Sequence, residues 1–85
     1  MIYEPAEDSY LIAKHIKKYA YKKRVLDMGT GSGILAKEAL KYSDYVVAVD
    51  IDEESVKHVK KQGIKAVLSN LFANVHGKFD LIIFN

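Results

Sequence analysis

The sequence contains no cysteine and no long apolar run, and its first residues carry no basic flank. Without cysteine the chain can form neither a disulfide framework nor a thiolate metal site. No apolar stretch approaches the roughly 18 residues that a membrane-spanning helix needs. The segment Met1–Pro5 also lacks the apolar core of a secretory signal, and we therefore expect a cytoplasmic protein.

The sequence also has no large excess of positive or negative charge, because 13 lysines and arginines nearly balance 11 acidic residues among 85. A net charge of +2 is too small to indicate a nucleic-acid-binding protein. The basic side chains between Lys17 and Arg24 are nevertheless close together in the sequence. They fit either a local nucleic-acid patch or an ordinary solvated helix end, where cations complement the helix dipole. The length allows one domain, residues 1–85, with a small core.

Apolar periodicity predicts helices and strands that alternate along the chain. The run Tyr45–Asp50 is apolar until its last residue, which is typical of a strand covered on both faces and paired in parallel. The alternation predicts an α/β fold with a doubly wound, mostly parallel sheet of strand order 3-2-1-4, which stops after its fourth strand. We predict helices over residues 6–21, 34–41 and 53–62, and strands over residues 24–27, 45–50, 65–68 and 79–84.

The turn between the first strand and the second helix carries the strongest chemical signal. It places Gly29, Gly31 and Gly33 at every second position. Glycines at this spacing remove the Cβ atoms that would keep a ligand from the backbone, and they permit the positive φ values of a tight turn. The helix that follows is expected to aim unpaired N–H groups into the turn. The turn therefore predicts a nucleotide-type cofactor.

Polar side chains close each predicted strand, namely Asp27, Asp50, Asn70 and Asn85. In an open parallel sheet the ligand lies beyond the carboxyl ends of the strands, so these side chains should gather at one edge. Asp50 follows Gly31 by 19 residues, close to the roughly 20-residue offset at which an acid reaches ribose hydroxyls. A carboxylate accepts from two vicinal hydroxyls at once. We therefore expect a ligand that contains ribose.

Two cofactor classes contain ribose, and the glycines do not separate them. The run from Gly31 to Ala36 satisfies the dinucleotide fingerprint G-x-G-x-x-A. Asp27 argues for the other class, because a carboxylate at the mouth of the turn would repel a pyrophosphate and attract a cation. Charges a few Å apart interact by about 4 kcal/mol at an effective dielectric near 20. We favour S-adenosylmethionine, with its sulfonium and ammonium groups, over a dinucleotide.

These residues together resemble a known family. The pattern Asp27-x-Gly29-x-Gly31-x-Gly33, then Val49-Asp50, then Phe79–Asn85 is similar to Rossmann-type S-adenosylmethionine-dependent methyltransferases. The similarity is greatest to the HemK-related branch, whose fourth strand ends in Asn-Pro-Pro-Tyr. The leader Tyr3–Ser9 resembles that of the archaeal and eukaryotic enzymes that methylate the glutamine of the Gly-Gly-Gln loop in peptide-chain release factors. The resemblance covers the chain and implies that it corresponds to the N-terminal, cofactor-binding part of such a domain.

The resemblance implies roles at the matching positions. Ser9 would contact the methionine end of the cofactor together with Asp27 and the backbone of Gly29 and Gly31. Asp50 would hold the ribose, in agreement with its spacing from the glycine turn.

Three further positions complete the implied site. Ile51 would pack on the adenine. Asn70 stands where the family commonly has an aspartate that binds the adenine amino group, and its amide oxygen can accept the same hydrogen bond without a charge. Asn85 would orient the target nitrogen for in-line displacement at sulfur, so catalysis would depend on positioning rather than on a metal.

The sheet edges predict partners. Strand 81–84 would be an open apolar edge, which proteins avoid because it recruits other chains. We expect that these 85 residues belong to a longer chain or that another chain, such as a second copy, completes the sheet. At the other edge, strand 65–68, the resembling enzymes pair with a small zinc-binding activator protein.

Three functions from different classes stay open. The leading one is a methyltransferase acting on a protein glutamine, with a release factor as substrate. The second is a methyltransferase acting on an exocyclic amine of RNA or DNA, with the Lys17–Arg24 patch as its docking surface. The third is a cofactor-binding fragment without catalysis. A metal enzyme is not expected, because His15, His58 and His76 lie far apart without ligand spacing.

Overall fold

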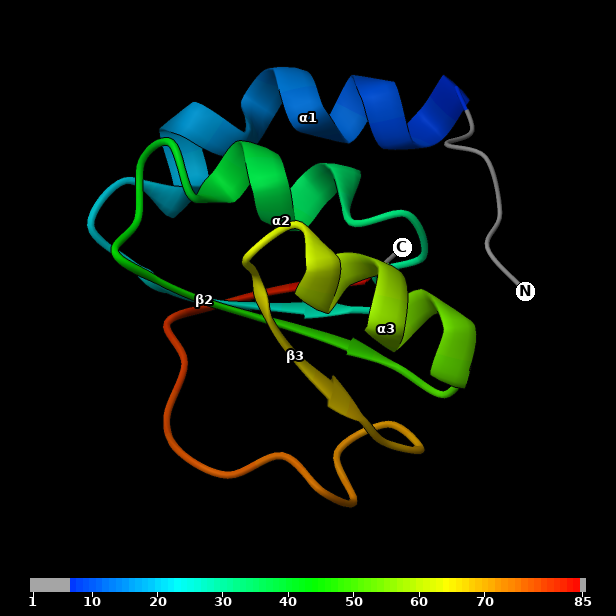
Figure 1. Cartoon of the computed structure of the whole chain (residues 1–85). Helices are drawn as coiled ribbons and strands as arrows, with labels where there is room; N and C mark the ends of the chain where they lie inside the picture. The colour runs from blue at the N-terminus through cyan, green and yellow to red at the C-terminus, as the bar shows by residue number, and fades with distance from the viewer. Residues whose placement is uncertain (1–6, 85) are drawn as a thin grey trace.

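The computed structural model describes residues 7–84, and the surroundings of side chains from residue 11 onward. None of the helices in this range has the length and hydropathy of a membrane span. Figure 1 shows the helices gathered on one side of a single sheet. The elements are α1 (Glu7–Ala20), β1 (Arg24–Met28), α2 (Ile34–Ala39), β2 (Tyr45–Asp50), α3 (Glu53–Lys61), β3 (Lys65–Leu68) and β4 (Leu81–Phe84).

The sheet has the order β3-β2-β1-β4, and all three pairs of strands are parallel. Both the predicted order and the predicted parallel pairing are confirmed. In the central strand, Asp27 lies beside Ala48 of β2 and Ile83 of β4. The chain adds β2 and β3 on one side of β1 and β4 on the other, so its winding reverses between β1 and β4. This reversal creates the switch point at which open α/β sheets bind their ligands.

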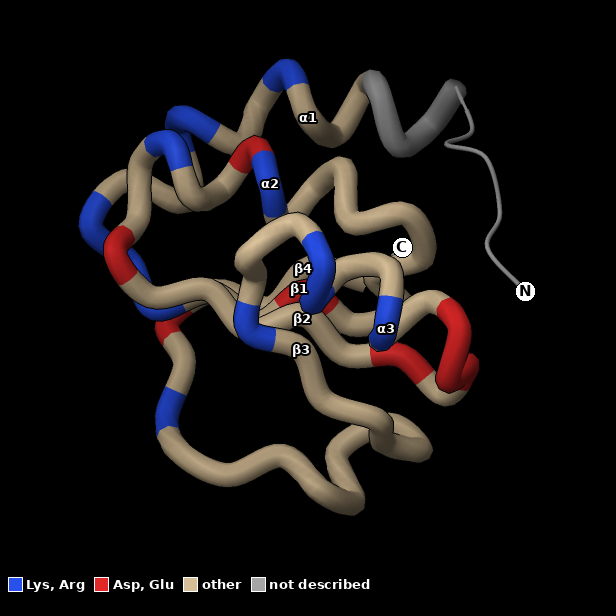
Figure 2. The backbone as a smooth tube through the Cα atoms, in the orientation of Figure 1, with Lys and Arg blue, Asp and Glu red and all other residues tan. Residues whose placement is uncertain are grey.

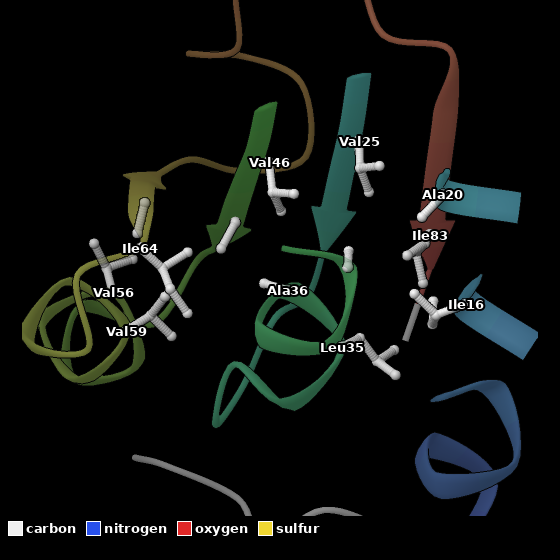
Figure 3. Packing of buried hydrophobic residues seen from close by; sticks show 13 residues of the cluster. Ile16, Ala20, Val25, Leu35, Ala36, Val46, Val56, Val59, Ile64 and Ile83 are labelled. Carbon is white, nitrogen blue, oxygen red and sulfur yellow. The ribbon is translucent and has the colours of Figure 1, made fainter. Parts of the chain in front are cut away.

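The main hydrophobic core lies between the sheet and the helices (Figure 3). Alternate residues of each strand face this layer, because successive side chains of a strand point to opposite faces. Each fully buried valine or leucine contributes about 1.5–3 kcal/mol relative to an exposed one. The core contains residues from every helix and strand, namely Ile16, Ala20, Val25, Leu35, Ala36, Ala39, Val46, Ala48, Val56, Val59, Ile64, Ala66 and Ile83.

The second face of the sheet is covered by the segment that connects β3 to β4. Leu26, Met28, Val47 and Val49 are buried there, and Val75 and Phe79 of the connecting segment pack against them. Figure 1 shows residues 69–80 as a long loop on the side of the sheet opposite the helices. The loop therefore brings the chain from the edge strand β3 across the sheet to β4.

Local contacts explain where the helices begin and end. The Asp52 carboxylate caps α3, since its Oδ2 accepts hydrogen bonds from the Ser55 N–H at 3.2 Å and the Ser55 hydroxyl at 2.9 Å. Helix α2 ends at Ala39, two residues before the predicted end. The Lys41 and Tyr42 N–H groups bond to carbonyls three residues earlier, so the last turn tightens.

Strand β4 begins at Leu81, two residues later than predicted. Its first pair joins Leu81 to Val25 of β1. The ring of Phe79 instead lies 6.0 Å from the ring of Tyr45 and belongs to the second face. The chain therefore enters the sheet only after Phe79 has covered the amino end of β2.

Candidate functional site

A hollow of about 220 Å³ opens at the carboxyl ends of the strands. It collects the last residues of β1, β2 and β4 and the residues that follow β1, β2 and β3 in the chain, and it lies at the predicted switch point. Figure 2 shows acidic residues near this end of the sheet and most of the lysines away from it. The lining residues are Met28, Gly29, Asp50, Ile51, Ser69, Asn70, Leu71 and Phe84.

Four residues predicted from the sequence lie in this lining: Gly29, Asp50, Ile51 and Asn70. They come from three segments of the chain, and parallel pairing of the strands brings their ends to one edge. Ile51 is 68% exposed although it is apolar. Asn70 is exposed as well. A partly polar, partly apolar hollow of this kind is typical of small-molecule sites.

Two predicted residues cannot be placed in the same way. Ser9 lies within α1, but its side chain is outside the described residues, as is Asn85 altogether. The hollow also contains residues that the sequence analysis did not assign to it. Of these, Leu71 carried no sequence signal, whereas Phe84 could have been assigned from its position at the end of the fourth strand.

The N–H groups of the glycine turn are already engaged. The Gly29 and Thr30 N–H groups both donate to the Val49 carbonyl oxygen, at 2.8 and 2.9 Å. The Gly31 N–H donates to Oδ2 of Asp50 at 2.9 Å. An anionic pyrophosphate would therefore find none of these three N–H groups available, whereas the expectation of unpaired N–H groups concerned the first turn of α2, which begins at Ile34. The Gly29 and Gly31 carbonyl oxygens accept no hydrogen bond from the part of the chain that the structure describes.

The glycines of the turn have different surroundings. Gly33 has φ +87°, and a Cβ atom added there would lie 3.0 Å from Cγ2 of Val59 in α3. Gly33 is therefore required for the close packing of the turn on α3. Gly31 has φ +56°, but an added Cβ would meet no atom within 4 Å. Gly31 thus faces open space, as a residue that approaches a ligand should.

Asp50 fastens the turn to the start of α3. One of its oxygens accepts the Gly31 N–H, and the other accepts the Asp52 N–H, each at 2.9 Å. The residue is half-buried and lines the hollow. An ionised carboxylate offers about four acceptor sites, so each oxygen keeps capacity for a second donor such as a ribose hydroxyl.

Asp27 does not lie at the mouth of the turn, and the prediction that it does is wrong. The side chain is fully buried and does not line the hollow. Because β1 continues to Met28, Asp27 lies inside the strand. Successive side chains of a strand point to opposite faces, so Asp27 points to the helix-covered face and Met28 to the other face. The Thr30 hydroxyl donates to Oδ2 of Asp27 at 2.9 Å. The other oxygen, Oδ1, is buried without a hydrogen-bond partner among the described residues.

This burial has an electrostatic consequence. Burial raises the pKa of Asp27 from its ordinary value of 3.8 to about 6; the Thr30 hydrogen bond and the nearby Ala36 backbone amide act in the opposite direction, while the negative Asp50 adds to the increase. Asp27 is therefore ionised at neutral pH. A buried carboxylate with one unpartnered oxygen, placed behind the turn, produces a negative potential that favours a cation without touching it.

Comparison with known proteins shows which proteins this chain is similar to. A family model described as "Methyltransferase small domain" matches residues 6–85. The Methanocaldococcus jannaschii protein named "Putative protein N5-glutamine methyltransferase" is 41% identical over 91 residues, which include 99% of this chain and 46% of that protein. The ribosomal protein L11 methyltransferase of Thermotoga neapolitana is 42% identical over 78 residues, which include 82% of this chain and 30% of that protein.

The likeness extends to a solved structure. The ribosomal protein L11 methylase of Lactobacillus delbrueckii subsp. bulgaricus superposes with a TM-score of 0.80 at 30% identity. The superposition covers 99% of this chain and 56% of that chain. This chain therefore spans about half or less of the length of the relatives that it matches.

Proposed function

Because the chain belongs to the methyltransferase small domain family, we propose that it binds S-adenosylmethionine in the hollow and serves methyl transfer to a nitrogen atom. The observation that carries this proposal is the state of the glycine turn. Three of its N–H groups are engaged within the protein, while Asp27 and Asp50 add negative charge beside it. Such a turn suits a cationic ligand and opposes a pyrophosphate.

The lining supports binding of the adenosine part. Asp50 would accept hydrogen bonds from the ribose hydroxyls with the acceptor sites that its backbone partners leave. Ile51, exposed in the protein alone, would lose that exposure against the adenine ring. The Asn70 side chain lies beside it in the lining and would accept a hydrogen bond from the adenine amino group.

The methionine end would lie against the glycine turn. The carbonyl oxygens of Gly29 and Gly31 would accept hydrogen bonds from the ammonium group, since the described residues leave both without a donor. The ionised Asp27 behind the turn would stabilise both positive charges of the cofactor, the ammonium and the sulfonium, by its field. Ser9 joins this part of the proposal through the family resemblance alone.

When bound, S-adenosylmethionine supplies an electrophilic methyl group on a positively charged sulfur. The residue that we propose for the substrate side is Asn85, whose side chain would hold the target nitrogen with its lone pair directed at the methyl carbon. Orientation of this kind lowers a barrier by up to about 7–11 kcal/mol in well-aligned systems. Chemistry of this type needs no nucleophilic side chain from the protein.

The substrate that we propose is the side-chain amide of a glutamine in a peptide-chain release factor. The leader and the name of the M. jannaschii relative both support a protein N5-glutamine as acceptor. The nucleic-acid alternative is weakened by the position of the basic patch. Lys22 and Lys23 precede the amino end of β1, whereas the hollow lies beyond its carboxyl end, about 15 Å away along the strand. A cofactor-binding fragment without catalysis is the third candidate.

Two sheet edges are available for the proposed partners. Strand β3 is the edge at which an activator subunit would pair, and Leu68 at its end is 45% exposed. Strand β4 is the other edge, where a further segment or a second copy would add a strand; Ile82 and Phe84 are exposed there. Size-exclusion chromatography with light scattering tests the second copy: a monomer across the micromolar range would exclude it.

Calorimetric titration of the chain with S-adenosylmethionine and with NAD tests the cofactor. We expect S-adenosylmethionine to bind at least tenfold more tightly, a difference of about 1.4 kcal/mol. Asp50→Ala should weaken its binding at least tenfold. Glu53→Ala removes an equal charge from an exposed position paired with Lys57, and it should change the affinity less than twofold. Tighter binding of NAD would overturn the proposal.

The acceptor is tested by incubating the chain with S-adenosylmethionine and either a release factor or a single-stranded RNA, followed by mass spectrometry. We expect a gain of one methylene mass on the glutamine of the Gly-Gly-Gln loop and none on the RNA. Methylation of the RNA with a steep loss of activity at rising salt would favour the nucleic-acid alternative. Binding of the cofactor without methylation of either acceptor would favour the non-catalytic one.

A further inference from the structure

The outward face of α1 carries a row of exposed side chains that continues into the turn after the helix. The row, which we call the basic stripe, consists of Lys14, Lys17, Lys18 and Tyr21. Their spacing of three, four and seven residues places them on one face of a helix, and they line an open groove of about 540 Å³. On the other side of the helix, Ile16 and Ala20 are buried in the core.

The basic stripe has no acidic neighbours in the sequence. Residues 9–26 contain neither aspartate nor glutamate, and within the described part of the chain no salt bridge involves a lysine of α1. The other helices differ: Lys41, just after α2, pairs with Glu38 at 2.8 Å, and Lys57 of α3 pairs with Glu53 at 3.1 Å. Like charges three and four residues apart destabilise a helix. The basic stripe therefore destabilises α1 unless an anion covers it.

The helix dipole accounts for part of this charge only. Its negative pole favours cations in the last turn of α1, which contains Lys17 and Lys18. Lys14 lies a full turn earlier, where this effect has faded. Figure 2 shows basic residues and no acidic one along the described part of α1. The basic stripe thus extends further than an ordinary solvated helix end.

Exposed aromatic rings accompany the lysines. Tyr21 is 59% exposed, and Nζ of Lys22 lies 5.4 Å from the centroid of its ring. Tyr19 is 54% exposed, and Nζ of Lys18 lies 5.5 Å from its ring centroid. Single-stranded nucleic acids bind to surfaces of this composition, because their bases stack on aromatic rings while lysines contact their phosphates.

We propose that the basic stripe is a docking surface for a single strand of nucleic acid, which binds there without accepting a methyl group. The three lysines contact its phosphates, and a base stacks on Tyr21. An acidic peptide would use the charge and leave the ring without a partner. An anionic membrane would need the apolar face of α1, which is buried in the core.

The position of the basic stripe separates this binding from the hollow. The carboxyl end of α1 leads into the amino end of β1, whereas the hollow lies beyond the carboxyl ends of the strands. A strand bound on α1 therefore leaves the hollow open. The inference goes beyond the proposed function, and it adds a partner that is neither cofactor nor methyl acceptor.

Fluorescence anisotropy with a labelled oligouridine RNA of about 12 nucleotides tests the docking. We expect it to bind at least tenfold more tightly than a duplex or a polyglutamate of the same length, and an oligothymidine DNA to bind within threefold of it. The logarithm of the association constant should fall with that of the salt concentration with a slope of about −2, about −0.7 for each lysine. Equal binding of polyglutamate or of the duplex would overturn the proposal.

The lysines are tested by Lys14→Gln with Lys18→Gln. This variant should bind oligouridine at least tenfold more weakly, with a salt slope of about −0.7, and its melting temperature should not fall because repulsion within α1 is relieved. The matched control is Lys57→Gln with Lys61→Gln, which removes two exposed charges at the same spacing from α3 and should change the affinity less than twofold. Equal losses in both variants would show that net charge alone matters and would overturn the proposal.

The ring is tested by Tyr21→Leu, which should weaken binding of oligouridine at least fivefold, whereas Tyr21→Phe keeps the ring and should change it less than twofold. An unchanged affinity in Tyr21→Leu would overturn the stacking. Saturating oligouridine should leave the dissociation constant of S-adenosylmethionine within twofold. Competition between the two ligands, or methylation of the oligonucleotide, would show that the strand enters the hollow and would overturn its role as a docking partner. Failure to bind oligouridine would leave the proposed function intact.

Discussion

The two ends of the sheet are built from similar parts and have opposite properties. At the amino end, the backbone N–H of Arg24 donates to Oδ2 of Asp80, and the Asp80 N–H donates to the Arg24 carbonyl oxygen. The Arg24 guanidinium lies 3.9 Å from the Tyr45 ring centroid. At the carboxyl end, by contrast, Oδ1 of Asp27 is buried without a partner among the described residues. The polar groups of Arg24 and Asp80 at the amino end are paired with each other, whereas a buried carboxylate oxygen at the carboxyl end is not paired.

The two ends of the sheet also share a structural feature. A buried serine fastens a turn at each end, Ser43 at the amino end and Ser69 at the carboxyl end. The Ser43 hydroxyl bonds to the Lys23 carbonyl oxygen, next to the left-handed Lys22. The left-handed residue at the amino end is a solvated cation, whereas the one at the carboxyl end is an exposed leucine. The two turns therefore differ in the exposed side chain of their left-handed residue, which is charged in Lys22 and apolar in Leu71.

The largest predicted effect concerns Asp27→Asn and the pH dependence of stability. Because the pKa of Asp27 rises from 3.8 unfolded to about 6 folded, the unfolded chain loses this proton first as pH increases. The free energy of unfolding should therefore fall between pH 4 and 6, by about 3 kcal/mol in all, and stay at the lower value above. Asp27→Asn should lack this fall and be more stable than the wild type at pH 7.5 in urea unfolding.

The matched control at the amino end is Asp80→Asn. Asp80 is exposed, and its loss of charge should change stability by no more than about 1 kcal/mol at any pH in this range. A wild-type chain whose stability rises from pH 4 to 6, or an Asp27→Asn variant with an unchanged slope, would refute the description of the carboxyl end.

A second prediction compares alanine substitutions of two glycines in the turn at the carboxyl end of the sheet. Gly33→Ala should destabilise the chain by about 2–3 kcal/mol, because overpacking against Val59 adds to the cost of its positive φ. Gly31→Ala meets no atom and should cost only about 1–2 kcal/mol for its φ, yet it should reduce binding of S-adenosylmethionine. Thermal unfolding and titration of both variants measure this. Equal stability losses would mean that Val59 yields to the added methyl group.

A third prediction compares the two buried serines. Ser43→Ala removes hydrogen bonds to Lys23 and Tyr45 and should cost about 1–3 kcal/mol of stability. Because Ser43 lies at the closed end, we expect binding of S-adenosylmethionine to change less than twofold, whereas Ser69→Ala, in the lining of the hollow, should weaken it. A comparable loss of affinity in the two variants would mean that both ends couple to the ligand.

The smallest effect is predicted for the basic residues of the amino end. The double variant Lys22→Glu with Lys23→Glu reverses charges that lie more than a Debye length, about 10 Å at 0.1 M salt, from the hollow. Titration should give a dissociation constant for S-adenosylmethionine within twofold of the wild type. A larger change would show that the basic patch contributes to the electrostatic potential in the hollow.

Sequence reasoning succeeded where a pattern depends on periodicity or on topology. The apolar run of β2 implied parallel pairing, and parallel pairing brought Asp50, Ile51 and Asn70 to one edge. It failed for Asp27, because β1 continues for one more residue, Met28, so that Asp27 lies inside the strand and shares the buried, helix-covered face with Val25. Leu71 could not be predicted, since leucine is an unfavourable residue for the conformation that the tertiary structure imposes on it.

The central claim is that the carboxyl end attracts a cation through the ionised Asp27, and the most direct measurement is the affinity for S-adenosylmethionine relative to S-adenosylhomocysteine as a function of pH. The homocysteine compound lacks the methyl group on sulfur, and with it the sulfonium charge, but is otherwise identical. Because the pKa of Asp27 is about 6, we predict that the preference for the sulfonium rises between pH 5 and 7 and that Asp27→Asn abolishes the rise. A preference that is constant with pH in the wild type, or unchanged in Asp27→Asn, would show that Asp27 does not supply this attraction.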